Sequence, residues 1–359
     1  MRRIAHSSVD PLSAPESLSR PLSCEPALEP PRPERLVFVV GAIEYRRRHL
    51  VAAARALGEW DALVRAAREE LACAARAAEL GDPLDPVEVE SAAAGFRRAR
   101  GLLAAEDLRT WLSERDLTAC DWLAHLRGTL LQKRWEDELG AIAGRAERYA
   151  AAELGRAVWT LWICTGACGE LAERLAVGAA AEAALARAGE PAGPSAREPD
   201  VGPVALEAAR AAAERLVEEA ATSGRIAREI ETHRVGWTSV DALLVVHPDL
   251  EVLHEVALCV SEDGRQLEEV AREAGAELRR SRLVLGELAP ELEARLLAAQ
   301  PGELLEPEPV GEAGWIVLVE AKTTPSPADP ELRGRARELI GARERARLLD
   351  DRVRWHERL

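Results

Sequence analysis

The stretch from Leu288 to Lys322 reads LAPELEARLLAAQPGELLEPEPVGEAGWIVLVEAK and carries the strongest structural signals of the chain. Its first third predicts a short helix, because leucines recur there at helical spacing. Pro301-Gly302 predicts the end of that helix, since proline cannot continue it and glycine tolerates a positive φ. Its last third predicts a strand covered on both faces, because Trp315 to Val319 is an unbroken run of apolar, strand-forming residues.

Composition narrows the class of protein. The chain has 359 residues and a net charge of -15, which argues against nucleic acid as a partner because phosphate binding needs an excess of Lys and Arg. Abundant Ala, Leu, Arg and Glu favour helices. No apolar run is long enough for a membrane span, and the N-terminal MRR is not followed by the apolar region of a secretory signal. We therefore expect a cytoplasmic protein with no membrane partner.

The six cysteines do not predict a metal site or a cofactor. Only Cys164 and Cys168 lie close together, and no second pair of Cys or His completes a zinc-binding set. We interpret both as free thiols within a packed helical region. The sequence also lacks the motifs of nucleophilic, metal-dependent and dinucleotide-dependent enzymes.

The pattern along the chain predicts an α+β protein: a mostly helical N-terminal region, a small β-α-α-β-α-β domain and a C-terminal helix. Asp85-Pro86 and Asp329-Pro330 have the residue types of a helix N-cap and first helical position. Prolines between 191 and 204 predict a linker. The expected segments are a disordered leader (1–34), a helical domain (35–190), the linker (191–204), a connecting helix that is single or broken near Thr222 (205–236), the small domain (237–323) and the C-terminal helix (324–359).

The small domain resembles the parvulin (PpiC-type rotamase) family. Pro290-Glu291-Leu292 stands at the family's Pro-Glu-Phe, and Leu297 takes the position of a second Phe. Pro301-Gly302-Glu303 matches a family turn, and Gly314-Trp315-Ile316-Val317 stands where the family has Gly-Tyr-His-Ile. The segment from Asp85 to Trp135 resembles the helical chaperone region of SurA-like proteins. The order of short motifs from 45 to 357 resembles parvulin-related proteins described as peptide-maturation factors.

The resemblance implies a peptidyl-prolyl isomerase, yet the residues depart from the family where it matters for catalysis. The family buries two histidines beneath its proline pocket. The first falls here near Ala242 or Leu243 and the second at Ile316. His247 and His254 follow the first strand and fit surface positions. The sequence therefore identifies no catalytic residue, and whether the chain is an enzyme stays open.

Three functions remain open. The first is a peptide-binding foldase or chaperone that holds an unfolded or precursor peptide without turnover, and the absent histidines favour it. The second is an active but divergent isomerase that works through an apolar pocket alone. The third is a helical scaffold.

We expect Leu292, Leu297 and Trp315 to converge on a shallow apolar groove. The sequence does not give the oligomeric state. The predicted peptide-binding residues are Leu244, Leu292, Leu297, Trp315 and Ile316.

Overall fold

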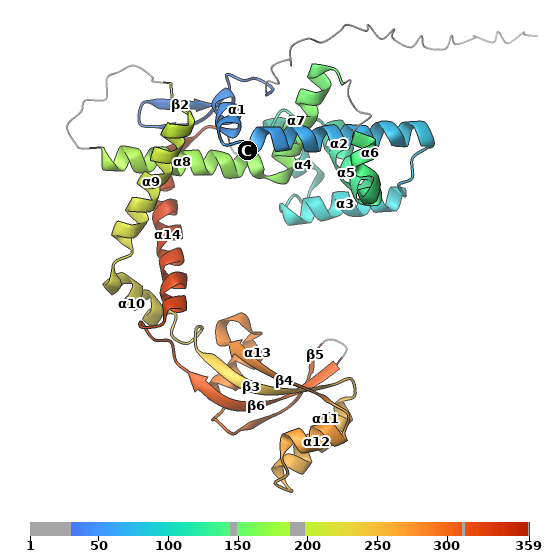
Figure 1. The fold of residues 1–359 in the computed structure, drawn as a ribbon, viewed down its shortest axis with the longest axis vertical. Coiled ribbons are helices and arrows are strands. Elements are labelled where there is room, and N and C mark those ends of the chain that lie inside the picture. The colour runs from blue at the N-terminus through green and yellow to red at the C-terminus, as the bar shows by residue number, and fades with distance from the viewer. Residues whose placement is uncertain (1–29, 144–148, 187–197, 311–312, 358) are drawn as a thin grey trace, which may run out of the picture. The chain divides into compact units, whose positions relative to one another are not determined.

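The computed structural model describes residues 30–143, 149–186, 198–310, 313–357 and 359. Within these residues the protein has fourteen α-helices and two small sheets, so its class is α+β, as the sequence predicts (Figure 1). The chain divides into two compact units. Unit 1 comprises residues up to Val37, Arg46–Leu171 and Glu357–Leu359, and unit 2 comprises Phe38–Tyr45 and Ala172–His356. Most of the predicted leader, residues 1–29, lies outside the described residues.

Unit 1 is helical, and local capping chemistry accounts for two of its helix starts. Asp85 accepts a hydrogen bond from the Val87 N–H, and Pro86 is the first residue of the following helix, as predicted. The Thr118 hydroxyl accepts a hydrogen bond from the Asp121 N–H at 3.2 Å, while the Asp121 carboxylate accepts one from the Thr118 N–H at 2.8 Å. The helices are α1 (Arg47–Ala56), α2 (Glu59–Leu80), α3 (Pro86–Ala99), α4 (Ala105–Glu114), α5 (Ala119–Arg134), α6 (Leu139–Ala143) and α7 (Ala151–Thr165).

A buried ion pair joins residues from the two ends of the described chain within unit 1. The Arg47 side chain is fully buried and that of Glu357 is 1% exposed. Arg47 Nε donates to Glu357 Oε2 at 3.0 Å, and Arg47 Nη1 lies 2.8 Å from Asp116 Oδ2. The Glu357 N–H also donates to the Val37 carbonyl at 3.0 Å. The buried guanidinium is thus matched by two carboxylates, which offsets the cost of removing it from water.

Unit 2 contains α9 (Pro203–Ala220), α10 (Ser223–Thr232) and α14 (Pro330–Arg352). The predicted connecting helix is broken, because Thr222 begins a new helix as the N-cap of α10. The predicted C-terminal helix ends earlier than expected. Residues Val353–Trp355 form strand β7, which pairs with β1 (Leu36–Val40), while β2 (Ile43–Arg46) lies on the other side of β1. Val353 and Trp355 favour a strand once such a partner is available.

The boundary between the compact units falls inside α8 (Ala167–Leu185), at residues 171–172, rather than in the predicted linker. The physical reason is close helix packing in unit 2. A Cβ atom built on Gly178 of α8 would lie only 2.8 Å from the Ala209 Cβ of α9, so these two helices approach where small residues allow it. Residues 191–197 of the predicted linker lie outside the described residues, and its role as a linker stays a prediction.

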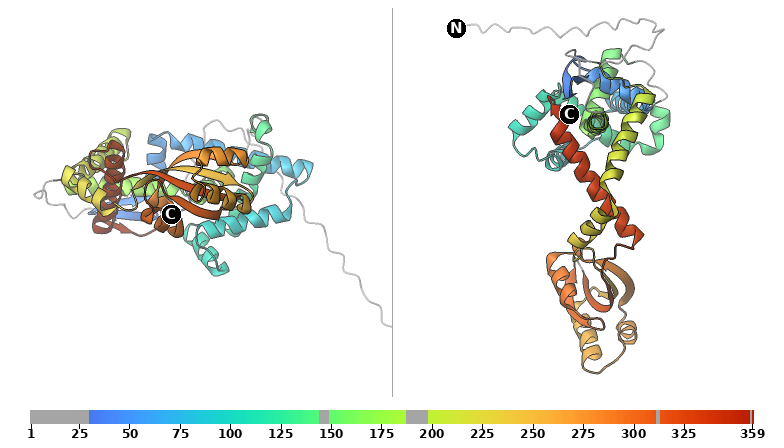
Figure 2. Two further views of the ribbon diagram at one scale, coloured as in Figure 1. Left: turned by 90° about the horizontal axis from the view of Figure 1, so that it is seen from below. Right: turned by 90° about the vertical axis from the view of Figure 1, so that its left-hand side faces the viewer.

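The small domain is a four-stranded antiparallel sheet with helices on both faces (Figures 1 and 2). The strand order is β4-β3-β6-β5. In chain order the elements are β3 (Ser239–His247), α11 (Leu250–Ser261), α12 (Leu267–Glu273), β4 (Glu277–Val284), α13 (Pro290–Ala298), β5 (Leu304–Val310) and β6 (Ala313–Thr323). We call this the sheet domain.

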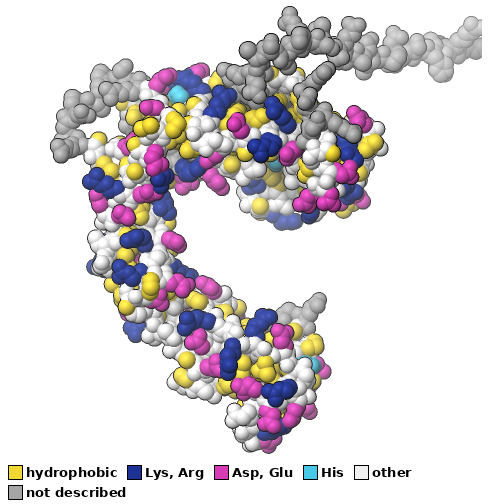
Figure 3. Space-filling model, viewed as in Figure 1, with side chains coloured by type: hydrophobic (Ala, Val, Ile, Leu, Met, Phe, Trp, Pro, Cys, Tyr) yellow, Lys and Arg dark blue, Asp and Glu magenta, His cyan; other side chains and the backbone are white. Residues whose placement is uncertain are grey.

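The sheet domain has one strand more than the predicted β-α-α-β-α-β order. Strand β5 contains Pro307 and Pro309, which normally argue against a strand. It is an outer strand that pairs only with β6, and an outer strand tolerates proline because one of its sides needs no N–H donor. The other outer strand, β4, carries three exposed arginines at 279, 280 and 282. Figure 3 shows that acidic and basic side chains are interspersed on the visible surface.

The buried ion pair predicts a stability effect. Arg47→Met leaves Glu357 buried beside fewer cations, so the free energy of unfolding should fall by about 3–5 kcal/mol, as for other broken buried pairs. Adding Glu357→Met should recover most of that loss. Urea unfolding followed by circular dichroism measures both. The control is Arg210→Met, because Arg210 is exposed on α9 and should give no measurable change. Equal losses in the single and double variants would contradict the prediction.

Two glycines of unit 2 should respond oppositely to alanine. Gly286 lies against the backbone of Gly236, and an added Cβ would sit 3.0 Å from the Gly236 carbonyl oxygen. Gly286→Ala should therefore destabilise the protein by about 1–3 kcal/mol. Gly334 lies in α14 with open space around it, so Gly334→Ala should stabilise by about 0.5–1 kcal/mol. Thermal unfolding distinguishes the two, and a shift of the same sign in both variants would refute the packing explanation.

Candidate functional site

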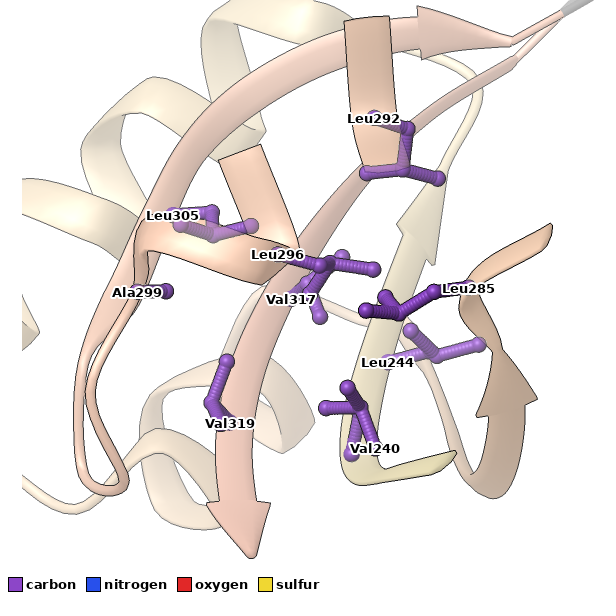
Figure 4. Close-up of a cluster of buried hydrophobic side chains, with 10 residues drawn as sticks. Val240, Leu244, Leu285, Leu292, Leu296, Ala299, Leu305, Val317 and Val319 are labelled. Atoms are coloured by element: carbon purple, nitrogen blue, oxygen red, sulfur yellow. The ribbon is translucent and has the colours of Figure 1, made fainter. Parts of the chain in front are cut away.

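One face of the sheet domain closes over a continuous apolar cluster (Figure 4). Alternate residues of the central strands β3 and β6 point to this face because side chains of a strand alternate in direction. Leucines of α13 and of the turn before it cover them, so we name this side the α13 face. The cluster consists of Val240, Ala242, Leu244, Leu285, Leu292, Leu296, Ala299, Leu305, Val317 and Val319.

The cluster has a partly accessible margin, which we call the Trp315 rim. It consists of the half-buried residues Leu283, Leu288 and Trp315, which pack against the cluster without being enclosed by it. Trp315 opens the apolar run of β6 and lies opposite Val246 of β3 and Glu308 of β5. Its Nε1 is buried and has no acceptor among the described residues. The rim thus offers partly accessible apolar surface, while the N–H of Trp315 is enclosed beneath it.

A polar contact fixes α13 next to this rim. Arg295 of α13 contacts the Glu308 carboxylate through Nη1 at 2.7 Å, and its Nη2 donates to the Glu306 carbonyl at 2.8 Å. Both side chains of the pair are about one-third exposed, so solvent screens the attraction and its contribution to stability is small. The main effect of the Arg295–Glu308 contact is to hold α13 in place against β5.

The structure brings together three of the five predicted peptide-binding residues. Leu244 and Leu292 are buried in the cluster, at 5% and 6% exposure, and Trp315 lies at its margin. Leu297 is 49% exposed and does not join the cluster, so the expected groove with Leu292 is not formed by both leucines. Ile316 is fully buried on the opposite face, because it neighbours Trp315 in a strand.

Sequence reasoning missed two rim residues. Leu283 lies in β4, opposite Val240 of β3, and its alternation with exposed arginines was the available signal. Leu288 was assigned to the helix, whereas α13 begins two residues later, at Pro290. These two leucines and Trp315 are the partly accessible apolar residues of the site, whereas Leu297 is exposed outside the cluster and Ile316 is buried.

The positions at which the parvulin resemblance places histidines hold apolar side chains. Ile316 and Leu243 are buried under α11 and α12, and Ala242 is buried on the α13 face. His247 is the last residue of β3, whereas we expected it after the strand, and its Nδ1 accepts a hydrogen bond from the Asp249 N–H at 3.0 Å. His254 is exposed on α11. No histidine of the sheet domain therefore lies in the centre of either apolar layer.

Cys164 and Cys168 of the helical region are buried thiols. Burial raises the pKa of Cys164 to about 12, although the nearby Arg100 acts in the opposite direction. Burial also raises the pKa of Cys168 well above its usual value. The described residues contain no group of three or more His, Cys, Asp or Glu side chains placed to hold a metal ion. Their helices also include none with the length and apolar character needed to cross a bilayer.

Comparison with known proteins gives distant likenesses only. No family model and no curated protein matches this sequence. Among solved structures, the chain is similar to the foldase protein PrsA from Lactococcus lactis, with 10% identity over 90% of this chain and 95% of that one, at a TM-score of 0.28. It is also similar to a structure reported for PEB4 and Cj1289, two structurally related SurA-like chaperones of Campylobacter jejuni, with 8% identity over 89% and 98%, at a TM-score of 0.19. Scores this low identify no equivalent residues.

Thiol reactivity tests the burial of the cysteines. The thiolate is the reactive form, so a raised pKa and burial both slow alkylation. At pH 8, iodoacetamide should label the exposed Cys120 much faster than Cys164 or Cys168 in the folded protein. All three should react at similar rates in 6 M guanidinium. Peptide mass spectrometry gives the rate at each site, and rapid labelling of Cys168 in the folded protein would overturn the assignment.

Proposed function

We propose that this protein is a peptide-binding chaperone or foldase that holds unfolded or precursor peptides, with a role in peptide maturation, and that it does not turn over X-Pro bonds. The observation that carries the proposal is the Trp315 rim. It leaves apolar surface partly accessible next to a closed core. An extended peptide has apolar side chains to place on such a rim.

The same site supports binding better than catalysis. Isomerisation of an X-Pro bond must overcome a barrier of about 20 kcal/mol, and each tenfold acceleration needs about 1.4 kcal/mol of extra binding to the twisted amide. The rim supplies apolar contacts, and the central strands place no titratable side chain beneath it. An apolar pocket can favour a twisted amide by excluding water, so isomerase activity is the alternative outcome of the test.

The binding test compares two leucines near the same helix. A dye-labelled, reduced and unfolded polypeptide is titrated with the protein, and binding is followed by fluorescence anisotropy. Leu288→Ala, in the rim, should weaken binding about tenfold, because it removes apolar contact area of the client. Leu297→Ala is the matched control and should bind as the wild type does, since this exposed side chain lies outside the cluster. Equal effects of the two substitutions, or no binding by the wild type, would remove the proposal.

The catalytic test uses a protease-coupled assay on an Ala-Pro-Phe peptide at micromolar protein. We expect no acceleration above the uncatalysed rate. Acceleration that Trp315→Leu abolishes, while the Leu297→Ala control keeps it, would replace the binding function by an isomerase. Circular dichroism of each variant shows whether the sheet domain has folded.

A further inference from the structure

Unit 1 contains a cluster of two arginines and three aromatic rings that the proposed function does not use. We call it the arginine–aromatic cluster, and it joins the ends of α3 and α4 to α5. The Phe96 ring lies 5.5 Å from Trp111 and 5.6 Å from Trp122, measured between centroids. The Arg100 guanidinium lies 3.8 Å from the Phe96 ring centre, and that of Arg115 lies 4.6 Å from Trp111. Phe96, Arg100 and Trp111 are half-buried and so remain partly accessible.

Arg100, although half-buried, has no carboxylate partner among the described residues of the kind that the buried Arg47 has. Its Nη2 donates to the Cys164 carbonyl, one of the unpaired carbonyls at the end of α7. No carboxylate lies within ion-pair distance of Arg100 in the part of the chain that the structure describes. Arg47, by contrast, contacts both Asp116 and Glu357. A guanidinium has five N–H donors, so the contact with Cys164 leaves most of those of Arg100 unused.

Two buried donors in the same cluster are also without acceptors. Arg115 is 7% exposed, and its Nε has no hydrogen-bond partner among the described residues. Trp122 is 5% exposed, and its Nε1 has none either. The carboxylate partner of Arg115 is Glu114 at 3.5 Å, whose side chain is 58% exposed and therefore screened by solvent. Burial lowers the pKa of Arg115; Glu114 and Glu357 oppose this shift, and the nearby charge of Arg100 adds to it, so Arg100 gains no carboxylate partner from its neighbour.

We propose that the arginine–aromatic cluster binds a carboxylate carried by a peptide next to an apolar residue. The carboxylate pairs with Arg100, for which the planar fork of N–H groups is suited. The neighbouring apolar side chain packs on the rings of Phe96 and Trp111, which are half-buried. This site belongs to unit 1, whereas the Trp315 rim belongs to unit 2. It goes beyond the proposed function because it would make the protein prefer peptides that carry a carboxylate.

Binding of designed peptides tests this site. The probes are ten-residue, dye-labelled, amidated peptides with a central Leu-Asp-Phe or, as a twin, Leu-Asn-Phe. The Asp peptide should bind the wild type at least tenfold more tightly than the Asn peptide in 50 mM salt. Arg100→Met should abolish that difference while keeping an apolar stem on Phe96. Arg98→Met is the matched control, because Arg98 is exposed on the same helix and its loss changes the net charge equally.

Equal binding of the Asp and Asn peptides by the wild type overturns the proposal, and so does an equal loss in the Arg98→Met and Arg100→Met variants. A third probe, the Asn peptide ending in a free carboxylate after Phe, separates the two sources of the charge. Tight binding of this probe assigns the site to peptide C-termini, and tight binding of the Asp peptide alone assigns it to acidic side chains.

A measurement on the wild type keeps the test independent of folding defects in a variant. Hydrogen exchange of the full chain with the Asp peptide should show added protection in residues 96–103 and 111–115. Protection confined to the sheet domain would place the peptide on the Trp315 rim and refute the second site. The Leu288→Ala variant should retain the difference between the Asp and Asn peptides, so failure of the rim proposal and failure of this one are distinguishable.

Discussion

The alternation of side chains along β3 and β6 is the constraint on which the sheet domain depends. Each strand lies between two others, so its residues point in turn to the α13 face and to the face covered by α11 and α12. Val317 and Ile316 are neighbours in the chain, yet they belong to different cores. Because both cores are filled with aliphatic side chains, a polar group in either centre would be buried without solvent. Contact with a ligand is left to the margin, where Trp315 is only half-buried.

Local signals in the sequence predicted much of this fold. Asp85-Pro86 and Asp329-Pro330 mark helix starts, and the run from Trp315 to Val319 is a strand with two buried faces. These predictions succeeded because capping and apolar patterning act within a few residues. Strand β7 could not be found in the same way, since its three residues form a strand only by pairing with β1 near the other end of the chain.

The candidate site was predicted less well, for geometric reasons. Leu292 and Leu297 are five residues apart, which on a helix of 3.6 residues per turn places them about 140° apart around the axis. One therefore enters the core while the other faces solvent. Strand β5 escaped notice because its prolines are acceptable only at a sheet edge, and a position at an edge is a property of the whole sheet. Arg100 lacks a carboxylate partner because no acidic side chain of the described residues lies within ion-pair distance of it, and spatial neighbours of this kind cannot be read from the sequence.

The two outer strands of the sheet domain also determine whether unfolded chains can add to the edges of its sheet. Unfolded polypeptide readily adds to an open strand, and growth of that kind ends in fibrils. Pro307 and Pro309 withhold the N–H groups that would continue such pairing at β5, while the exposed arginines at 279, 280 and 282 disfavour it at β4 through charge and solvation. With both edges protected in this way, the sheet domain can contact partly folded chains through its side chains without pairing with their backbones and starting aggregation.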